Sequence, residues 1–341
     1  MSQDHRKIRF GLWYDFRNPP ESRQASDRLY SEILDQIAWG ENHGFDDVWL
    51  SEHHFIEDGY LPSILPVAAA IAARTKRIRI ASGVLLMPFH NPVRLAEDIA
   101  VVDVISGGRF ELGVGVGFKH EEFDGFGAPF EERGARTNQS LEIIRRLLSG
   151  ETVTFKREFF DFKNVKVTPE PVQKPHPPVW LGGFTPAALR RAARYGDGFT
   201  VPGATRDVYD QYVAELKKQN RPIDNIRFAS AVWCLLVSND PEKAFSEAAD
   251  HIIYQANNYS KWLSAAGLSP LSEHLQSHEE LRKSRLLQVV APEAAIKMLQ
   301  AFADAVQITH FYSWTLPPGL TPRWAQALLE LFASKVIPAF R

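Results

Sequence analysis

Three ionisable side chains stand together directly after an apolar segment. Residues 47–51 read Asp-Val-Trp-Leu-Ser, and Glu52, His53 and His54 follow. Ionisable groups are costly to bury unless they are paired, solvated or used, and histidine changes its charge near neutral pH. The residue types therefore indicate acid–base chemistry at the end of a strand. Neighbours on an extended segment point to opposite sides, so we expect one imidazole in a common site and the other in a structural hydrogen bond.

A second candidate site lies where two glycines precede a helix. The segment 180–189 places Gly182, Gly183 and Thr185 directly before a helix whose first turn holds Pro186. Glycines let the backbone approach an anion, and the free N–H groups of a first helical turn favour a phosphate. Taken alone, the segment is explained equally well by a plain N-cap after a glycine turn.

The elements that must position these residues alternate in type along the chain. Eight strand candidates alternate with helical segments of apolar periodicity, which predicts a parallel sheet, and eight units favour closure into a barrel. We predict one TIM-like (β/α)8 barrel over residues 1–341; the alternative is an open doubly wound sheet, which residues 15–19 disfavour because they lack a G-x-G-x-x-G turn. The predicted strands are 8–14, 47–51, 78–85, 110–116, 179–181, 198–201, 228–237 and 309–314.

Two stretches interrupt this alternation. Residues 117–177 contain a polar loop, a helix over 133–149, two short strand-like runs and a Pro-rich connection. We interpret them as an insertion after strand four, because they hold too little apolar material for a second core. Residues 258–290 are polar and follow strand seven, after a helix over 240–257. Long segments of this kind are uncommon in compact domains unless they close over a site, so we predict a mobile lid.

In a barrel of this type, the residues just after each strand share one face. That face is rich in aromatic residues and glycines and poor in acids, which suits a large planar ligand. Together with the Gly-Gly-x-Thr segment, it favours a phosphorylated aromatic cofactor. The side chains expected to set substrate specificity there are Trp13, Met87, Phe118, Trp233 and Trp314.

Composition excludes several classes of function. The net charge is −2 and the basic residues are dispersed, so neither a nucleic-acid surface nor an anionic membrane surface is indicated. The single cysteine, Cys234, rules out a disulfide within the chain. No apolar run approaches the roughly 20 residues of a membrane span, and residues 1–7 hold no apolar signal core, so we predict a cytoplasmic protein. Strand one offers no histidine pair for a metal hydrolase, and we predict no metal site.

The helix over 63–74 is unusually apolar for one outward-facing barrel helix, with alanine at 68–70 and 72–73. Small side chains allow close approach of another helix. We predict that this helix packs against a second copy of the chain, which gives a homodimer.

Several motifs, in their order and spacing, resemble the bacterial luciferase-like flavin monooxygenase family over nearly the whole chain. The matching segments are 52–55 (Glu-His-His-Phe), Pro88 with 91–94 and Glu97, 106–115, 122–123 with 126–127, 132–133, 180–183, 192–193 with 196–198, and 336–341.

The resemblance implies reduced FMN bound at the carboxyl ends of the strands and supplied by a separate flavin reductase. Oxygen would add to this flavin to give a flavin hydroperoxide, which oxygenates a small organic substrate. His53 matches the family's acid–base histidine. His54 matches its second, more structural histidine, and Glu52 lies beside both.

The resemblance also assigns cofactor contacts. A non-proline cis peptide beneath the flavin aligns with Gly83 and Val84, and residues 258–290 match a mobile lid. The phosphate site matches Thr185 with the amides of Gly183, Ala187 and Ala188.

The chain departs from the family at one flavin-facing position. Gly115 and Val116 replace a reactive cysteine and a phosphate-binding arginine of the luciferase catalytic subunit. Lys119, Arg133 or Arg136 would then meet part of the phosphate charge, and light emission is not supported.

Two alternatives share this fold. One subfamily uses a deazaflavin for hydride transfer, although the Glu-His-His-Phe form is more typical of the FMN branch. Noncatalytic partner subunits lose the first histidine, whereas this chain keeps His53.

Overall fold

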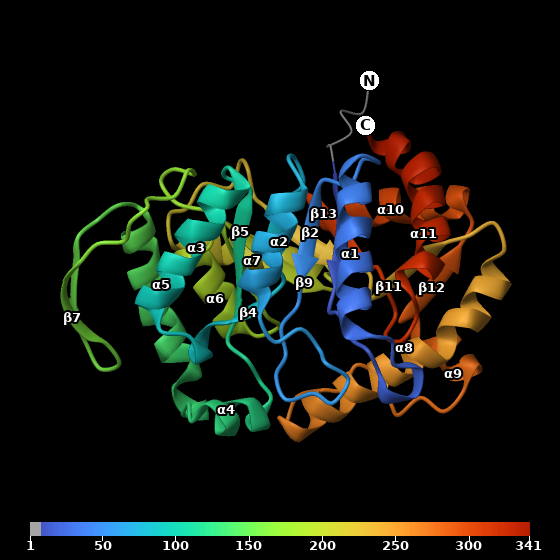
Figure 1. The fold of residues 1–341 in the computed structure, drawn as a ribbon, viewed down its shortest axis with the longest axis horizontal. Helices are drawn as coiled ribbons and strands as arrows, with labels where there is room; N and C mark the ends of the chain where they lie inside the picture. Colours follow the sequence, from blue (N-terminus) through green and yellow to red (C-terminus); the bar gives the residue numbers. More distant parts are fainter. Residues whose placement is uncertain (1–7) are drawn as a thin grey trace.

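The computed structural model describes residues 8–341. Eight parallel strands follow the order β3-β2-β1-β13-β10-β9-β8-β5, and pairing of β3 with β5 closes them into a barrel (Figure 1). This confirms the predicted TIM-like fold. The strands are β1 (Arg9–Tyr14), β2 (Asp47–Leu50), β3 (Arg79–Ser82), β5 (Phe110–Gly115), β8 (Val179–Gly182), β9 (Gly198–Pro202), β10 (Phe228–Ala231) and β13 (His310–Trp314).

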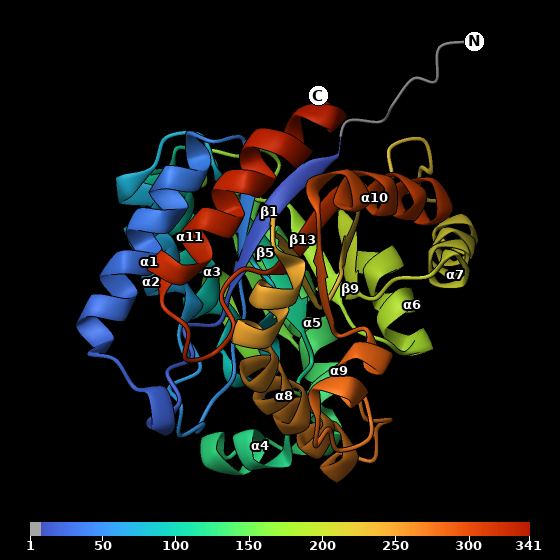
Figure 2. The same ribbon diagram turned by 90° about the vertical axis from the view of Figure 1, so that its right-hand side faces the viewer.

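Helices surround the barrel, and Figure 2 shows several of them around the strands. They are α1 (Ser26–Glu41), α2 (Ile64–Arg74), α3 (Pro92–Ser106), α5 (Arg133–Leu148), α6 (Pro186–Tyr195), α7 (Arg206–Lys218), α10 (Pro292–Val306) and α11 (Pro322–Leu331). The bounds of α3 follow directly from sequence. The Asn91 side chain accepts hydrogen bonds from the N–H groups of Val93 and Arg94, and Gly107 ends the helix at a left-handed φ of 65°.

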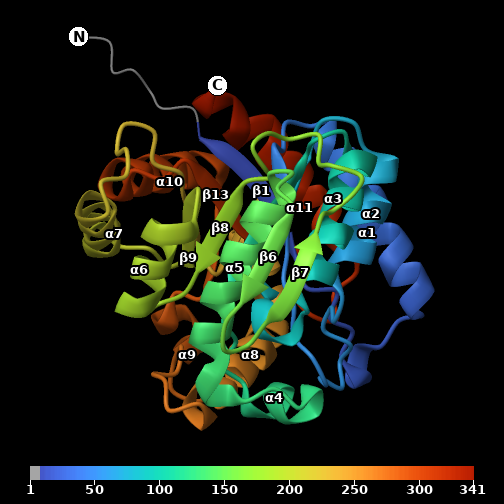
Figure 3. The same ribbon diagram turned by 90° about the vertical axis from the view of Figure 1, so that its left-hand side faces the viewer.

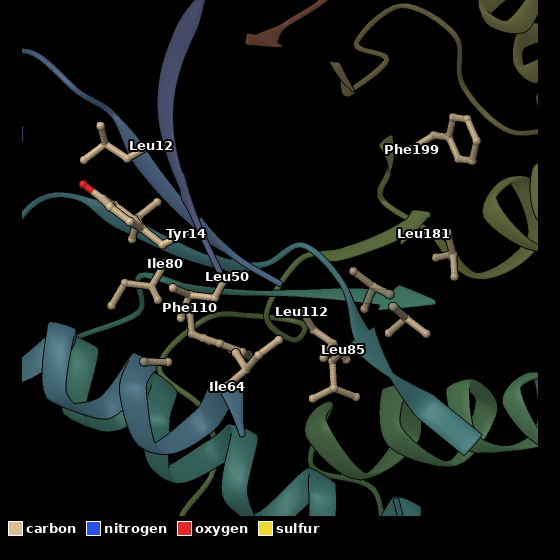
Figure 4. Close-up of a cluster of buried hydrophobic side chains, with 14 of the residues drawn as sticks. Leu12, Tyr14, Leu50, Ile64, Ile80, Leu85, Phe110, Leu112, Leu181 and Phe199 are labelled. Carbon is tan, nitrogen blue, oxygen red and sulfur yellow. The ribbon is translucent and has the colours of Figure 1, made fainter. Parts of the chain in front are cut away.

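Strand residues alternate between two cores. One set points outward against the helices, and Figure 4 shows Ile80 and Phe110 of this outer core near Ile64 of α2. The other set fills the barrel interior with large aromatic rings. These interior residues include Trp13, Trp49, Trp180, Tyr312 and Trp314.

Two predicted strands are divided in the structure. β3 stops at Ser82, and β4 (Leu85–Leu86) resumes after a cis peptide between Gly83 and Val84, the bond that the family resemblance implied. The predicted strand 228–237 is β10 followed by β11 (Cys234–Val237). β11 leaves the barrel and pairs in parallel with β12 (Leu287–Val290), so the continuous apolar run concealed a change of sheet.

The helix over 133–149 was wrongly assigned to the insertion. It is α5, the barrel helix that follows strand four, and it packs against both α3 and α6. Its buried stripe of Leu141, Ile144 and Leu148 has the spacing of a core-facing helix. The insertion that remains comprises α4 (His120–Phe126) and an antiparallel hairpin beside α5, β6 (Val153–Lys156) and β7 (Asp161–Val165) (Figure 3).

The segment 258–290 contains regular structure. α8 (Pro241–Ala265) extends beyond the predicted end at 257, because Trp262 and Leu263 continue its buried face. α9 (His278–Ser284) and β12 follow, so mobility of a lid here stays a prediction. In all three ribbon views α4 and α8 lie at the end of the barrel opposite the C-terminus, where the strands finish (Figures 1–3).

Within residues 8–341, no helix is long and apolar enough to cross a membrane. The same residues contain no group of three or more His, Cys, Asp or Glu placed to hold a metal ion. The expectation for residues 1–7 lies outside the described part of the chain.

Candidate active site

His53 is held by a buried carboxylate from α4. Its Nδ1 lies 2.8 Å from Oε1 of Glu122, and the backbone N–H of His54 donates to the same oxygen at 2.9 Å. The Glu122 side chain is completely buried. A carboxylate at Nδ1 fixes that nitrogen as the proton carrier, which leaves Nε2 as the atom that can exchange a proton with a ligand.

His54 has a different partner. Its Nε2 lies 2.9 Å from Oε1 of Glu52, and Nε2 of His90 lies 3.7 Å from the same oxygen. Burial by itself would raise the pKa of Glu52, but the two imidazoles hold that pKa below its ordinary value. The neighbouring histidines therefore enter separate networks, one with α4 and one with the α3 side of the barrel.

Four aromatic residues surround the His53 ring. Tyr60, Phe118, Tyr259 and Trp262 have ring centroids between 4.9 and 5.8 Å from the imidazole centroid. Tyr259 and Trp262 come from α8, and the hydroxyls of Tyr60 and Tyr259 lie 2.7 Å apart. We call these four residues the aromatic box. They bring the α8 insertion into direct contact with the barrel and keep water away from the imidazole.

Tryptophans extend this aromatic surface into the barrel. Trp13 stacks on Trp314 with a centroid distance of 3.6 Å and an interplanar angle of 10°. Trp233 contacts both Trp314 and Tyr259, which connects the barrel interior to the aromatic box.

Met87 was predicted to face the substrate. The structure instead places it, wholly buried, in the outer core, because the chain turns into a short 3-10 helix there.

Val84 occupies the space between the ends of β5 and β8. A Cβ atom on Gly115 would lie 2.6 Å from a methyl carbon of Val84, and one on Gly182 would lie 2.9 Å from the other methyl carbon. Both glycines are therefore needed for the half-buried Val84 side chain to sit there. The result is an apolar shelf flanked by bare backbone, a surface that a planar ring can approach.

The Gly-Gly-x-Thr segment opens α6. Gly183 has a φ of 144°, and the exposed Thr185 caps the helix, with its Oγ1 accepting from the Ala188 N–H at 3.3 Å. The structure thus confirms that Thr185 is the N-cap of this helix. Ala187, also exposed, follows Pro186 in the same first turn. The positive end of the helix dipole therefore faces an accessible surface, as phosphate binding requires.

The three candidate phosphate cations all have partners nearby in sequence. Nζ of the buried Lys119 lies 3.6 Å from Glu121, and Arg136 pairs with Glu132 at 2.7 Å. The Arg133 guanidinium stacks 3.6 Å over the Phe130 ring. The exposed first turn of α6 therefore offers the clearer donors for a phosphate, its backbone N–H groups.

Sequence reasoning missed a buried polar cluster beside the aromatic box. Arg17 donates through Nε to Asp58 at 2.6 Å, and Asp58 also accepts from the Tyr254 hydroxyl of α8 at 2.9 Å. Burial raises the pKa of Asp15 to about 7, against the opposing effect of the Arg17 charge. Asp15 and Arg17 follow β1 directly, so the rule that residues just after each strand share one face would have found them.

Glu122 was noted as part of a family motif but not as a partner of His53. The two residues are 69 positions apart, and no local pattern joins them.

Comparison with known proteins agrees with this architecture. A family model described as luciferase-like monooxygenase matches residues 8–304. The oxygenase component of a flavin-dependent trigonelline monooxygenase from Acinetobacter baylyi is 24% identical over 352 residues, covering 98% of this chain and 96% of that protein.

Solved structures show the same fold. A monooxygenase from Streptomyces bottropensis superposes with a TM-score of 0.84 at 24% identity, covering 98% of this chain and all of that one. An F420-dependent secondary alcohol dehydrogenase superposes with a TM-score of 0.77 at 20% identity, covering 98% and 99%. The fold is therefore shared with a monooxygenase and with an F420-dependent dehydrogenase.

Proposed function

The chain belongs to the luciferase-like monooxygenase family, and from that premise we propose that it oxygenates a small organic substrate with O2 and reduced FMN. The observation that supports this proposal best is His53, held through Nδ1 by a buried carboxylate inside an aromatic box. A dry, oriented imidazole at the carboxyl end of a barrel is suited to moving one proton at a reacting oxygen.

The residues at the barrel mouth fit FMN. Val84, with Gly115 and Gly182 beside it, offers a shelf for the flavin ring. Gly183 and the first turn of α6, at Thr185, Ala187 and Ala188, offer N–H groups and a helix dipole for the phosphate. Bound reduced FMN would supply the electrons that activate O2.

The protein side chains would then control the proton and the solvent. Nε2 of His53 exchanges a proton with the reacting oxygen, and the charge of Glu122 stabilises the imidazole when it is protonated. The aromatic box excludes water from this exchange, which protects a reactive species from hydrolysis. Trp13 and Trp314 adjoin the box through Trp233 and would shape the substrate end of the site.

The cofactor would come from another protein. The trigonelline relative is named as an oxygenase component, which implies a separate component that reduces the flavin. We propose the same division here, with a flavin reductase as partner and the cytoplasm as the location of both.

A second function is hydride transfer with F420, a deazaflavin. The F420-dependent structural neighbour favours it, because that enzyme shares the fold over nearly its whole length. In that case His53 would exchange a proton with a carbonyl or hydroxyl oxygen of the substrate, and O2 would play no part.

Stopped-flow spectroscopy separates these two functions. Protein loaded with photoreduced FMN is mixed with oxygenated buffer, and free reduced FMN serves as the control. We expect an absorbing species that long outlives the one formed by free flavin. Immediate reoxidation, together with tight binding of F420 in equilibrium titration, would contradict the FMN proposal and support hydride transfer.

We also propose that a second copy of the chain covers the face formed by α2 and α3. A groove of about 520 Å³ lies between these helices, lined by Leu65, Ala69, Val101 and Ile105 among others. Val101 and Ile105 are exposed on α3, and exposed apolar surface of this kind commonly marks an interface. The small side chains of α2 admit the close approach that the sequence predicted.

Sedimentation velocity tests this interface. The parent protein should sediment as a dimer at micromolar concentration, and the variant Val101→Glu/Ile105→Glu should sediment as a folded monomer. A parent monomer, or a variant that remains dimeric, would contradict the proposal.

A further inference from the structure

Arg17 is a buried guanidinium whose hydrogen bonds are largely missing. Its side chain has no exposed surface, and only Nε has a partner, the Oδ2 atom of Asp58. Both terminal amino groups of Arg17 lack hydrogen-bond partners among residues 8–341, and so does the Oε1 atom of Gln255 nearby on α8. A buried, charged donor without an acceptor is costly, so either a ligand or a buried water must complete this cluster.

A second buried arginine shows what a purely structural role requires. Arg109 uses all five of its N–H donors, on Ser106, Ala72, Ile78 and two oxygens of Thr75. It lies at the amino end of β5, far from the mouth. The same fold can therefore saturate a buried arginine fully, and it does not do so at Arg17.

Two aromatic rings, those of Tyr60 and Trp262, contact both Arg17 and His53. The Arg17 guanidinium lies 5.5 Å from the ring centroid of Tyr60 and 5.6 Å from that of Trp262, and both rings also pack against the His53 imidazole. Tyr254 of α8 supplies a third ring at 5.1 Å. Arg17 and His53 therefore pack against the same two rings, and a ligand that displaced Trp262 of α8 would reach both side chains.

We propose that Arg17 is a specificity-determining residue, whose free amino groups bind an oxygen acceptor at the end of the substrate remote from the oxidised atom. The acceptor is a carboxylate or a carbonyl oxygen, and the body of the substrate is apolar or aromatic to match the box. This inference rests on the proposed function, because it names the substrate class of the same site.

The charges around Arg17 distinguish the two acceptors. Asp58 already neutralises the guanidinium. The Asp15 carboxyl lies in the same cluster, where it accepts from the backbone N–H of Arg17 at 3.2 Å and from the Gln255 side-chain amide at 3.3 Å. A substrate carboxylate would be a third carboxyl group beside one guanidinium and would bind together with a proton. A carbonyl oxygen would bind without proton uptake. The pH dependence of binding therefore identifies the acceptor.

Binding of small probes tests the proposal without flavin or oxygen. The probes are benzoate, acetophenone and ethylbenzene, which share a ring and differ in the oxygen acceptor, and tryptophan fluorescence reports binding because Trp262 packs against Arg17. We expect the parent protein to bind benzoate or acetophenone at least about tenfold more tightly than ethylbenzene. Preference for benzoate that grows as the pH falls through 7 identifies a carboxylate, whereas a pH-independent preference for acetophenone identifies a carbonyl.

The informative variant is Arg17→Met/Asp58→Asn, which removes both charges and leaves no orphaned carboxylate. It should bind the preferred probe about 10 to 100 times more weakly and lose the preference over ethylbenzene. Asp58→Asn alone keeps the amino groups of Arg17 and should keep the preference. Arg109→Met, at the other end of the barrel, should keep it too.

Three results would overturn the proposal: a preference that survives in the double variant, equal binding of all three probes, or no binding of any. Each would mean that a buried water bridging Arg17 and Gln255 satisfies the cluster and that Arg17 is structural. Because these measurements use neither flavin nor oxygen, such a failure leaves the stopped-flow test of the proposed function unaffected.

Discussion

Arg109 and Arg17 stand at opposite ends of one barrel and show how differently the two ends are built. At the amino end, Arg109 is saturated, and Glu111 accepts from both Arg79 and the Trp180 indole. Among the described residues, the amino end leaves Oδ2 of Asp47 without a partner, whereas the carboxyl end leaves several buried polar atoms without one. They include the amino groups of Arg17, Oε2 of Glu122, Oε1 of Gln255 and the indole nitrogens of Trp233 and Trp314.

The difference separates stability from function within one fold. Polar groups that bond only to one another fix the geometry of the strands, whereas unsatisfied groups are available to a ligand. His53 belongs to the second kind, because Glu122 occupies one ring nitrogen and leaves the other for chemistry. Changes at the carboxyl end should therefore alter turnover and binding, and changes at the amino end should alter the free energy of unfolding.

Replacement of His53 should give the largest effect. We expect His53→Ala to lower oxygenation by a factor of about 10²–10⁴, the usual contribution of general acid–base catalysis, with flavin binding and thermal unfolding close to the parent. The measurement is product formed from whichever compound the parent oxygenates. The matched control is His176→Asn, a buried histidine just before β8, which should keep its turnover. Equal losses of turnover in both variants would contradict the assignment of catalysis to His53.

Arg109→Met should cost stability and leave chemistry intact. The variant leaves five acceptor interactions unmade, so the free energy of unfolding should fall by about 2–4 kcal/mol in urea titration. Turnover per folded molecule, measured at low temperature, should match the parent. A folded Arg109→Met protein with impaired turnover would show that the amino end also serves catalysis.

Glu122→Gln should have a smaller effect, confined to turnover. The amide oxygen can still accept from His53 and His54, but it lacks the charge that stabilises a protonated imidazole, so turnover should fall about tenfold. The KM for the substrate and the affinity for flavin should not change, because Glu122 acts through His53. A raised KM with normal turnover would assign Glu122 to binding instead.

Asp15→Asn should give the smallest effect, visible as a change in pH dependence. The pKa of Asp15 in the folded protein is about 7, above its ordinary value of 3.8. Its contribution to stability is therefore fully present below about pH 4 and is lost as the pH rises through 7. The stability of the variant relative to the parent should rise between pH 6 and pH 8, by roughly 1–2 kcal/mol. Asp224→Asn, which is exposed, should show no such trend.

The barrel and the place of its chemistry could be predicted from sequence, because both depend on local patterns. Period-two and helical apolar spacing located the strands and ring helices, and the end of the strand at Leu50 located His53. The apolar run 228–237 could not reveal that β11 leaves the barrel, since burial in either sheet requires the same residues. The end of α8 was missed because Lys261 and Ser264 on its exposed face hid the buried Trp262 and Leu263.

The partners of the site could not be predicted from local patterns. Glu122 meets His53, and Tyr254 meets Asp58, only through the arrangement of distant segments. Met87 illustrates the reverse error, because its position after a strand suggested the mouth while a single 3-10 turn directs it into the outer core. Long-range polar contacts depend on the packed fold, and the sequence carries no periodic signal for them.

The pairing of β11 with β12 brackets the segment that contains α8 and α9, here called the cassette, and allows it to be exchanged as a unit. The segment leaves β11 after Val237 and re-enters at Leu287, which pairs with Cys234 at the other end of the same short parallel ladder, so both of its ends are fixed by that pairing whatever lies between them. When the two ends of a segment are held in place, the free energy of loop closure changes only slowly with the length of the segment. Grafting a relative's cassette between these two strands should therefore be an effective way to redesign what the enzyme accepts, with the barrel and its His53–Glu122 pair left in place.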